Sequence, residues 1–260
     1  MRLNQLKQRF QSGEGVVNGW LSLPCAFAAE IMAHQGWDSL TIDMQHGLID
    51  YADLLPMLIA ISTTDTVPLV RVPSLEPGLI MKVLDAGAYG VIAPLINNAQ
   101  DARALVAACR YPPLGMRSFG PHRAMLYGGA DYATHANAEM LVLGMIETRE
   151  GVANLEEILA VEGLDGIYIG PADLALTHGF TPGFDHPDGP MDDLIQQLIE
   201  RTRRQGKRVG IHNGGAAHAR SMLTRGCDLV TVGSDARLLA TGARTLLEAM
   251  ERTTHHQEGY

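Results

Sequence analysis

The feature that most limits how this chain can fold is a regular alternation of short apolar runs with longer amphipathic segments. Eight runs are rich in leucine or β-branched residues and mostly apolar along their length, which is typical of parallel strands buried on both faces. These predicted strands lie at residues 15–23, 39–43, 67–72, 90–94, 140–147, 166–170, 207–212 and 229–233. Predicted helices follow them at residues 26–35, 52–62, 77–86, 99–109, 151–160, 191–205, 217–225 and 236–252. This alternation predicts either an open doubly wound sheet or a closed barrel.

Chain length and the first strand–helix turn favour the barrel. A (β/α)8 or TIM barrel needs about 250 residues, and this chain has 260. No Gly-x-Gly-x-x-Gly follows the first predicted strand, which weakens the case for a doubly wound dinucleotide-binding sheet. We therefore predict an α/β fold with one (β/α)8 barrel over residues 1–252 and a flexible tail at 253–260.

Two stretches interrupt the alternation. Residues 111–139 form a segment of nearly thirty residues with several prolines and glycines. Loops of this length in a compact domain are usually functional or form an interface. A second irregular stretch, at residues 177–190, follows the sixth predicted strand.

Composition and charge exclude several classes of function. A net charge of −9 and a pI near 5.5 oppose the basic face that nucleic-acid binding needs. No apolar run resembles a signal peptide or approaches the length of a membrane span. The three cysteines, Cys25, Cys109 and Cys227, are too scattered for a disulfide framework, which favours a reducing compartment. We expect a cytoplasmic protein that binds neither nucleic acid nor membranes.

Polar side chains follow several of the predicted strands. Catalytic groups of (β/α)8 barrels project from the carboxyl ends of the strands and from the loops after them. The polar residues at these positions are Asp43, Gln45 and His46 after the second strand, Arg71 in the third, Glu147 in the fifth, Asp173 after the sixth, and His212 and Asn213 at the end of the seventh. The sequence thus predicts that they meet on one rim of the barrel.

Glu147 and Asp173 are the natural ligands for a hard metal ion. Carboxylates on neighbouring strands, completed by water and substrate oxygens, suit Mg²⁺ or Mn²⁺. The alternative is that each carboxylate caps the following helix or pairs with an arginine. The residues alone leave both interpretations, metal ligand and structural carboxylate, open.

His46 and Arg71 supply an acid–base group and an anion-binding group. Asp43 would fix the tautomer of His46 and raise its basicity, although a lone histidine is more often a structural hydrogen-bonding residue. Arg71 presents a planar fork to a substrate carboxylate. Its structural alternative is a salt bridge to Asp43 or Glu147.

A metal ion, a carboxylate clamp and a base together favour chemistry beside the carbonyl of a 2-oxo acid. The metal would stabilise the enolate formed as a carbon–carbon bond breaks. A Schiff-base mechanism needs a lysine at a strand end. The only lysines are Lys7, Lys82 and Lys207, and Lys207 opens its strand at the wrong end.

Motifs spread over nearly the whole chain carry a resemblance to a known family. They are Trp20, Asp-Met-Gln-His-Gly at 43–47, Pro-Leu-Val-Arg-Val at 68–72, Tyr-Pro-Pro-Leu-Gly-Met-Arg at 111–117, Ile-Glu-Thr-Arg-Glu-Gly at 146–151, Gly-Ile-Tyr-Ile-Gly-Pro-Ala-Asp-Leu at 166–174 and Val-Gly-Ser-Asp at 232–235. With these residues the sequence resembles the metal-dependent pyruvate aldolases of the HpcH/HpaI family, the 4-hydroxy-2-oxoheptanedioate aldolase group.

The resemblance implies roles for individual residues. Glu147 and Asp173 would bind a divalent metal (Mg²⁺, Mn²⁺ or Co²⁺), and His46 would be the acid–base with Asp43 behind it. Arg71 would hold the pyruvyl part. Other residues implied at the substrate are Trp20, His212, Gly170, Ala172 and Asp173, the last two through backbone amides. The resemblance also implies a swapped C-terminal helix and a homohexamer, a trimer of dimers, in which Asp85 of the partner subunit reaches the site.

Two residues depart from the pattern of many relatives, which have Glu at position 45 and Gln at position 145. Gln45 and Met145 remove a charge and a hydrogen bond beside the expected metal, which affects metal preference and water positioning. The aldehyde half of the substrate is left open: Arg117, His122 and Arg123 of the long loop, together with His212 and Asn213, are candidates to bind it. Alternatively, these residues join subunits or are solvated.

We predict a divalent-metal-dependent aldolase that cleaves a 4-hydroxy-2-oxo acid to pyruvate, or a pyruvate analogue, and an aldehyde. A 2-oxo-dicarboxylate decarboxylase or a CoA-thioester lyase could use the same metal site, although no adenine-nucleotide site is evident. A non-catalytic metal-binding scaffold is the third reading, and the base, arginine and carboxylates together weigh against it.

Overall fold

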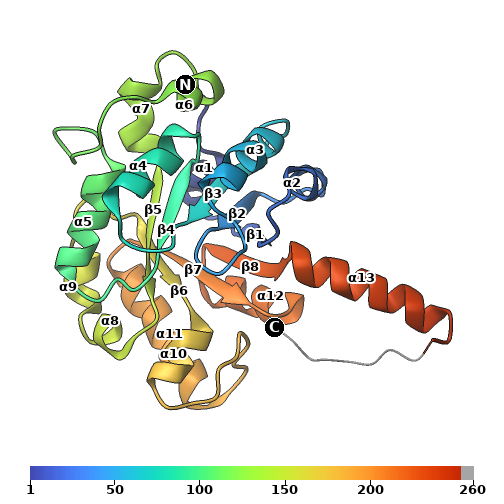
Figure 1. Cartoon of the computed structure of the whole chain (residues 1–260). Coiled ribbons are helices and arrows are strands. Elements are labelled where there is room, and N and C mark those ends of the chain that lie inside the picture. The colour runs from blue at the N-terminus through green and yellow to red at the C-terminus, as the bar shows by residue number, and fades with distance from the viewer. Residues whose placement is uncertain (253–260) are drawn as a thin grey trace.

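The eight strands close into a parallel barrel in sequence order, as a computed structural model describing residues 1–252 shows (Figure 1). All neighbouring strands pair in parallel, and the register of β2 with β3 places Asp43 beside Arg71. The strands are β1 (Val16–Leu21), β2 (Ser39–Asp43), β3 (Val67–Arg71), β4 (Gly90–Ala93), β5 (Leu141–Ile146), β6 (Gly166–Ile169), β7 (Arg208–Asn213) and β8 (Leu229–Ser234). The predicted (β/α)8 barrel is therefore confirmed.

Helices surround the barrel and connect its strands. They are α1 (Gln5–Ser12), α2 (Ala26–Ala33), α3 (Tyr51–Ile61), α4 (Pro77–Asp85), α5 (Ala99–Cys109), α6 (His122–Gly128), α7 (Tyr132–Glu139), α8 (Arg149–Ala153), α9 (Leu155–Leu159), α10 (Pro171–Thr177), α11 (Gly189–Arg204), α12 (Ala216–Arg225) and α13 (Asp235–Ala249). Local sequence sets their ends: Asp50 caps α3 and forms a reciprocal capping box with Asp53. The single helix predicted at 151–160 is instead divided at Asn154 into α8 and α9.

Strands β2 to β6 are buried along their whole length, which explains why their sequences are continuous apolar runs instead of alternating ones. Each fully buried Leu, Ile or Val contributes about 1.5–3 kcal/mol relative to an exposed position. The barrel is thus a packed core whose chemistry is confined to its ends.

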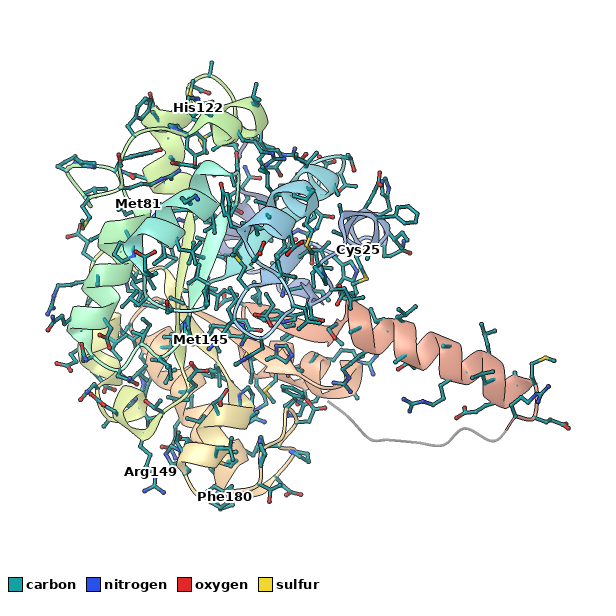
Figure 2. All side chains as sticks on the ribbon, viewed as in Figure 1. Cys25, Met81, His122, Met145, Arg149 and Phe180 are labelled. Carbon is teal, nitrogen blue, oxygen red and sulfur yellow. The ribbon has the colours of Figure 1, made fainter. Side chains whose placement is uncertain are left out.

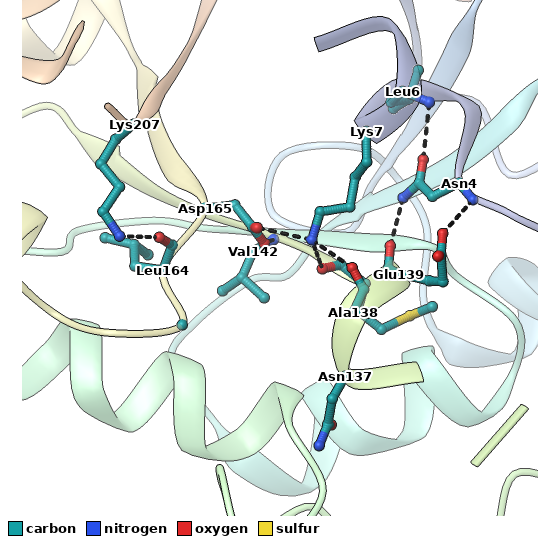
Figure 3. A network of polar contacts seen from close by, with 12 residues as sticks. Asn4, Leu6, Lys7, Asn137, Ala138, Glu139, Val142, Leu164, Asp165 and Lys207 are labelled. Carbon is teal, nitrogen blue, oxygen red and sulfur yellow. Dashed lines mark hydrogen bonds and ion pairs between the residues drawn. The ribbon is translucent and has the colours of Figure 1, made fainter. Parts of the chain in front are cut away.

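The amino-terminal segment is fixed to the end of the barrel where the strands begin. Asn4 donates to the backbone oxygen of Glu139 at 2.8 Å, and Lys7 pairs with Asp165 at 2.9 Å (Figure 3). Lys207 donates to the carbonyl of Leu164 at 2.7 Å in the same network. Lys207 therefore has a structural role and lies at the amino ends of the strands, opposite the carboxyl rim, as the sequence predicted.

The long segment at 111–139 also lies at this amino end, because it joins the end of α5 to the start of β5. It folds into α6 and α7 beside the chain's amino terminus (Figure 1), where the Arg2 amide donates to Gly128 O at 2.6 Å. Arg110, directly before the segment, joins its two ends by donating a hydrogen bond to Met140 O at 2.9 Å. The segment therefore lies on the face opposite the carboxyl rim of its own barrel, and the contact of its residues with the aldehyde half stays a prediction.

The last helix, α13, leaves the barrel and projects away from it (Figure 1). Of its residues only Asp235 is buried, and Leu239 and Leu246 are 67% and 70% exposed. Residues 253–260, the predicted tail, lie outside the described residues. Within residues 1–252, no helix combines the length and apolar character needed to cross a membrane.

Candidate active site

The centre of the carboxyl rim is a paired carboxylate and guanidinium. Asp43 ends β2 and Arg71 ends β3, and the sheet register sets them side by side. Arg71 Nε donates to Asp43 Oδ1 at 2.8 Å, and Arg71 Nη2 donates to Oδ2 at 2.7 Å. Both residues are buried. The salt bridge that the sequence offered as an alternative is thus present.

This pairing leaves part of Arg71 available for a ligand. Asp43 occupies the Nε–Nη2 edge of the guanidinium, whose fork carries five N–H donors. The Nη1 atom and the second Nη2 hydrogen form another edge, for which residues 1–252 provide no hydrogen-bond partner. That edge matches a substrate carboxylate, so Arg71 can serve both interactions at once.

Asp43 organises the loop that carries His46. Its carboxylate accepts the backbone N–H groups of Gln45 (3.0 Å) and His46 (3.3 Å) and the indole N–H of Trp20 (3.2 Å). Burial alone would raise the pKa of Asp43, but the hydrogen bond and charge of Arg71 and the two backbone N–H groups hold it below its usual value. Asp43 therefore stays ionised.

The relation between Asp43 and His46 differs from the expected one. Asp43 holds the main chain of His46, whereas the imidazole is exposed and has no hydrogen bond to any described residue. Arg71 has already taken both carboxylate oxygens, which explains why the ring is not oriented by Asp43. His46 is thus held on the rim with its side chain open to solvent.

Glu147 and Asp173 form the second feature of the rim. Glu147, directly after β5, is buried and accepts the Leu95 backbone N–H at 2.8 Å through Oε1. Asp173 lies exposed in the first turn of α10. Burial and the nearby charge of Asp173 raise the pKa of Glu147, while the Leu95 N–H and Arg71 oppose that shift. A cation bound between these two carboxylates would offset the repulsion between them.

The donor set fits a divalent metal with open coordination positions. Glu147 Oε2 and both oxygens of Asp173 have no partner within residues 1–252, and no cluster of three or more His, Cys, Asp or Glu suited to a metal occurs there. A pair of carboxylates leaves sites for water and substrate. The buried Gln45 Oε1 also lacks a partner and is suited to accept a hydrogen bond from water.

Gly170 and Met145 shape the space beside Glu147. A Cβ atom at Gly170 would lie 2.8 Å from Glu147 Oε2 and 3.0 Å from the Met145 methyl, so a side chain there would displace one of these groups. Met145 is 2% exposed and lies within the barrel (Figure 2). Ala172 and Asp173 open α10, whose free backbone N–H groups face the start of the helix.

A buried polar network that the sequence did not indicate lies next to Trp20. Tyr168 Oη is 2.7 Å from Thr231 Oγ1 and 3.2 Å from His212 Nδ1, and Asn18 Nδ2 donates to Thr231 Oγ1 at 2.8 Å. The available signal was the presence of Asn18, Tyr168 and Thr231 inside otherwise apolar strands. His212, a predicted site residue, joins this network.

Four predicted site residues do not join the rim. Asp85 ends α4 and pairs with the fully buried Arg117 at 2.8 Å. Arg123 donates to the carbonyl of Ala86, also at the amino end of the strands. Figure 2 shows His122 at one end of the molecule and Phe180 and Arg149, which follow β6 and β5, at the other. Helix α5 leads the chain from the carboxyl end of the barrel to its amino end, where the segment at 111–139 begins. The sequence does not show this without the order and direction of the elements.

The rim therefore holds a buried arginine–carboxylate pair, an exposed histidine and two adjacent carboxylates at the carboxyl ends of a (β/α)8 barrel. These features define the class of a (β/α)8-barrel enzyme whose polar groups gather at the carboxyl ends of its strands.

Comparison with known proteins identifies the family within this class. Residues 19–241 match the HpcH/HpaI aldolase/citrate lyase family. The chain is 43% identical to a hydroxypyruvate/pyruvate aldolase of Rhizorhabdus wittichii, over 94% of this chain and 98% of that one. It is 39% identical to a 4-hydroxy-2-oxo-heptane-1,7-dioate aldolase of Salmonella dublin, over 94% and 93% of the two chains. An HpcH/HpaI family protein of Burkholderia cenocepacia superposes with a TM-score of 0.88 at 35% identity, covering 95% of this chain and 99% of that one. The chain belongs to the HpcH/HpaI aldolase/citrate lyase family, and the resemblance seen in its motifs is confirmed.

Proposed function

We propose that the protein is a divalent-metal-dependent aldolase that cleaves a 4-hydroxy-2-oxo acid to pyruvate, or a pyruvate analogue, and an aldehyde. The observation that carries the proposal is the free edge of Arg71 on the same rim as Glu147 and Asp173. The aldolases at 43% and 39% identity support the reaction class.

Each residue has a distinct part in this reaction. Arg71 binds the substrate carboxylate through its free edge, and Asp43 keeps the guanidinium in place. Trp20, with its indole N–H on Asp43 and its ring 4.8 Å from the Arg71 Cζ, forms a wall beside the carboxylate. Backbone N–H groups at Ala172 and Asp173 face the same anion at the start of α10.

Proton transfer falls to His46, the acid–base group whose ring is open to the substrate. It removes the proton from the 4-hydroxyl group as the C3–C4 bond breaks, and it returns a proton to C3. Glu147 and Asp173 hold the divalent ion. That ion, when bound, stabilises negative charge developing on the 2-oxo oxygen.

The assembly that we propose is a homohexamer built from dimers that exchange α13. The projecting helix with exposed Leu239 and Leu246 supports this arrangement, because an apolar face of this kind requires a cover. Asp85 supports it too: Arg117 binds its Oδ1, and no residue within 1–252 binds its Oδ2 at the amino end of the barrel. In the assembly that we propose, this oxygen of the partner subunit's Asp85 meets His46 on the carboxyl rim. The free cysteines are consistent with a cytoplasmic enzyme.

The test is release of pyruvate from a panel of 4-hydroxy-2-oxo acids with Mg²⁺, Mn²⁺ or Co²⁺, each repeated with EDTA. We expect release that requires the metal and stops with the chelator. Release only from oxaloacetate-type acids would favour a decarboxylase, and release only from CoA thioesters would favour that class of lyase. No turnover in any arm would overturn the proposed function.

A further inference from the structure

The polar network beside Trp20 ends at His212, and the direction of the Tyr168 hydrogen bond decides which ring nitrogen of His212 carries the hydrogen. Tyr168 has a single phenolic proton, which it donates to Thr231 Oγ1 at 2.7 Å. When Tyr168 donates in this direction, its oxygen accepts a hydrogen bond from His212 Nδ1 at 3.2 Å, and Nδ1 carries the hydrogen. The Nε2 atom of a neutral His212 then presents a lone pair.

The network is anchored deep in the barrel and cannot easily rearrange. Tyr168 and Thr231 are fully buried. Asn18 donates to Thr231 Oγ1 at 2.8 Å and accepts the hydroxyl of Ser39 at 2.8 Å. Groups bonded in this way in a low-dielectric interior are held in fixed rotamers and tautomers.

The surroundings of His212 keep the imidazole neutral. Its ring packs edge-on against Trp20, with centroids 4.9 Å apart, and Phe184 covers it at the same centroid distance. Burial, followed by the positive charge of Arg71, lowers the pKa of His212 to about 3. His212 nevertheless remains partly accessible, and no residue within 1–252 bonds to Nε2.

His212 and Arg71 both lie against Trp20, the imidazole centroid at 4.9 Å and the guanidinium Cζ at 4.8 Å from the ring centroid. The Arg71 guanidinium lies over the Trp20 ring, and the His212 ring packs against Trp20 in a T-shaped arrangement. The pyruvyl carboxylate belongs at Arg71. With that carboxylate at Arg71, as the proposed function has it, His212 is left to contact the remainder of the substrate.

We propose that His212 selects a neutral, hydroxylated aldehyde by accepting a hydrogen bond from its hydroxyl group through Nε2, with Tyr168 as the positioning residue. The inference rests on the proposed function and names its second product. A lone pair attracts a hydroxyl hydrogen, gains nothing from a methyl group and repels a carboxylate oxygen. A hydroxylated aldehyde is thus favoured over an apolar one and over an acid semialdehyde.

The experiment is a competition in the direction of aldol addition, with limiting pyruvate and the holoenzyme. Glycolaldehyde competes against propanal, which replaces the hydroxyl by a methyl group, and separately against succinic semialdehyde. The product ratio is independent of total activity. We expect wild-type enzyme to prefer glycolaldehyde in both pairs, and His212→Phe to lower its preference over propanal by about tenfold. His212→Gln, which keeps an acceptor, should restore part of it, and Tyr168→Phe should lower it.

A control and a spectroscopic readout separate this role from a structural one. His135→Phe makes the same change on exposed α7 at the other end of the barrel and should leave the ratio unchanged. Nitrogen-15 spectra of labelled histidine, assigned by loss of one signal in His212→Phe, should show a neutral Nδ1–H tautomer at pH 5. An unchanged ratio in His212→Phe, an Nε2–H tautomer, or a wild-type preference for propanal or succinic semialdehyde would overturn the inference.

The same samples keep the two proposals distinguishable. Metal-dependent exchange of the pyruvate methyl hydrogens in D₂O by wild-type enzyme tests the proposed function without any aldehyde. If exchange and aldol addition occur but the ratios do not change, only the role of His212 fails. If wild-type enzyme neither exchanges nor adds, the proposed function itself fails.

Discussion

Arg71 gives the Nε–Nη2 edge of its guanidinium to Asp43, at 2.8 and 2.7 Å, and keeps its other edge free. The buried carboxylate orients the arginine and balances its charge before any substrate binds. This arrangement lowers the cost of ordering Arg71 for the substrate carboxylate that we propose it binds.

We expect Arg71→Lys to raise the KM for the 2-oxo acid by about tenfold to a hundredfold, because an ammonium group cannot form both planar pairs. Steady-state kinetics of pyruvate release measure the change. Arg103→Lys, at an exposed position on α5, is the matched control. An unaltered KM would make Arg71 a purely structural partner of Asp43.

Asp173→Ala should remove one of only two carboxylate ligands and lower Mn²⁺ affinity. Loss of an outer-shell partner alone costs about 10–100-fold in metal affinity, so loss of a ligand should cost at least as much. Calorimetric titration of the metal-free protein gives the affinity. Asp188→Ala, an exposed carboxylate that makes no side-chain cap bond, should bind Mn²⁺ normally. Equal affinity in Asp173→Ala would assign the metal to other residues.

His46→Ala should slow cleavage by about 10²–10⁴-fold, the usual contribution of a positioned acid–base group. Metal affinity should stay near that of wild type, because the ring is exposed and makes no hydrogen bond to a described residue. His135→Ala on α7 is the control. Retained turnover in His46→Ala would assign proton transfer to another group.

The stability of the fold should depend on pH through His212. Its folded-state pKa of about 3 lies below the ordinary value of 6.5, so the unfolded chain binds a proton that the native chain excludes. This contribution is complete above pH 6.5 and is lost as pH falls toward 3, with a slope of at most about 1.4 kcal/mol per pH unit. Urea unfolding of wild type and His212→Phe at several pH values measures it. The variant should show the flatter dependence, and parallel curves would contradict the expectation.

Leu246→Glu should dissociate the assembly if α13 is exchanged between subunits, because it places a charge on an apolar face that must be covered. Light scattering coupled to size exclusion reports the mass. Ile59→Glu, a half-exposed residue of α3, provides a matched substitution elsewhere. An assembly of unchanged mass in Leu246→Glu would argue against a role for this helix.

The sequence alone predicted the barrel and the residues on its rim. Parallel strands buried on both faces leave a direct trace in composition, and the rule that catalytic groups follow the strands turned Asp43, Arg71, Glu147 and Asp173 into one predicted site. The motifs, among them the one at 166–174, carried the resemblance to the family.

The tertiary structure decided which partners these residues choose. Asp43 could pair with His46 or with Arg71, and the β2–β3 register settled the choice for Arg71. The long segment at 111–139 looked like part of the site because length and composition do not reveal which end of a barrel a loop occupies. The network of Asn18, Thr231, Tyr168 and His212 joins four strands that are distant in sequence. Contacts of this kind depend on barrel closure, which no local pattern encodes.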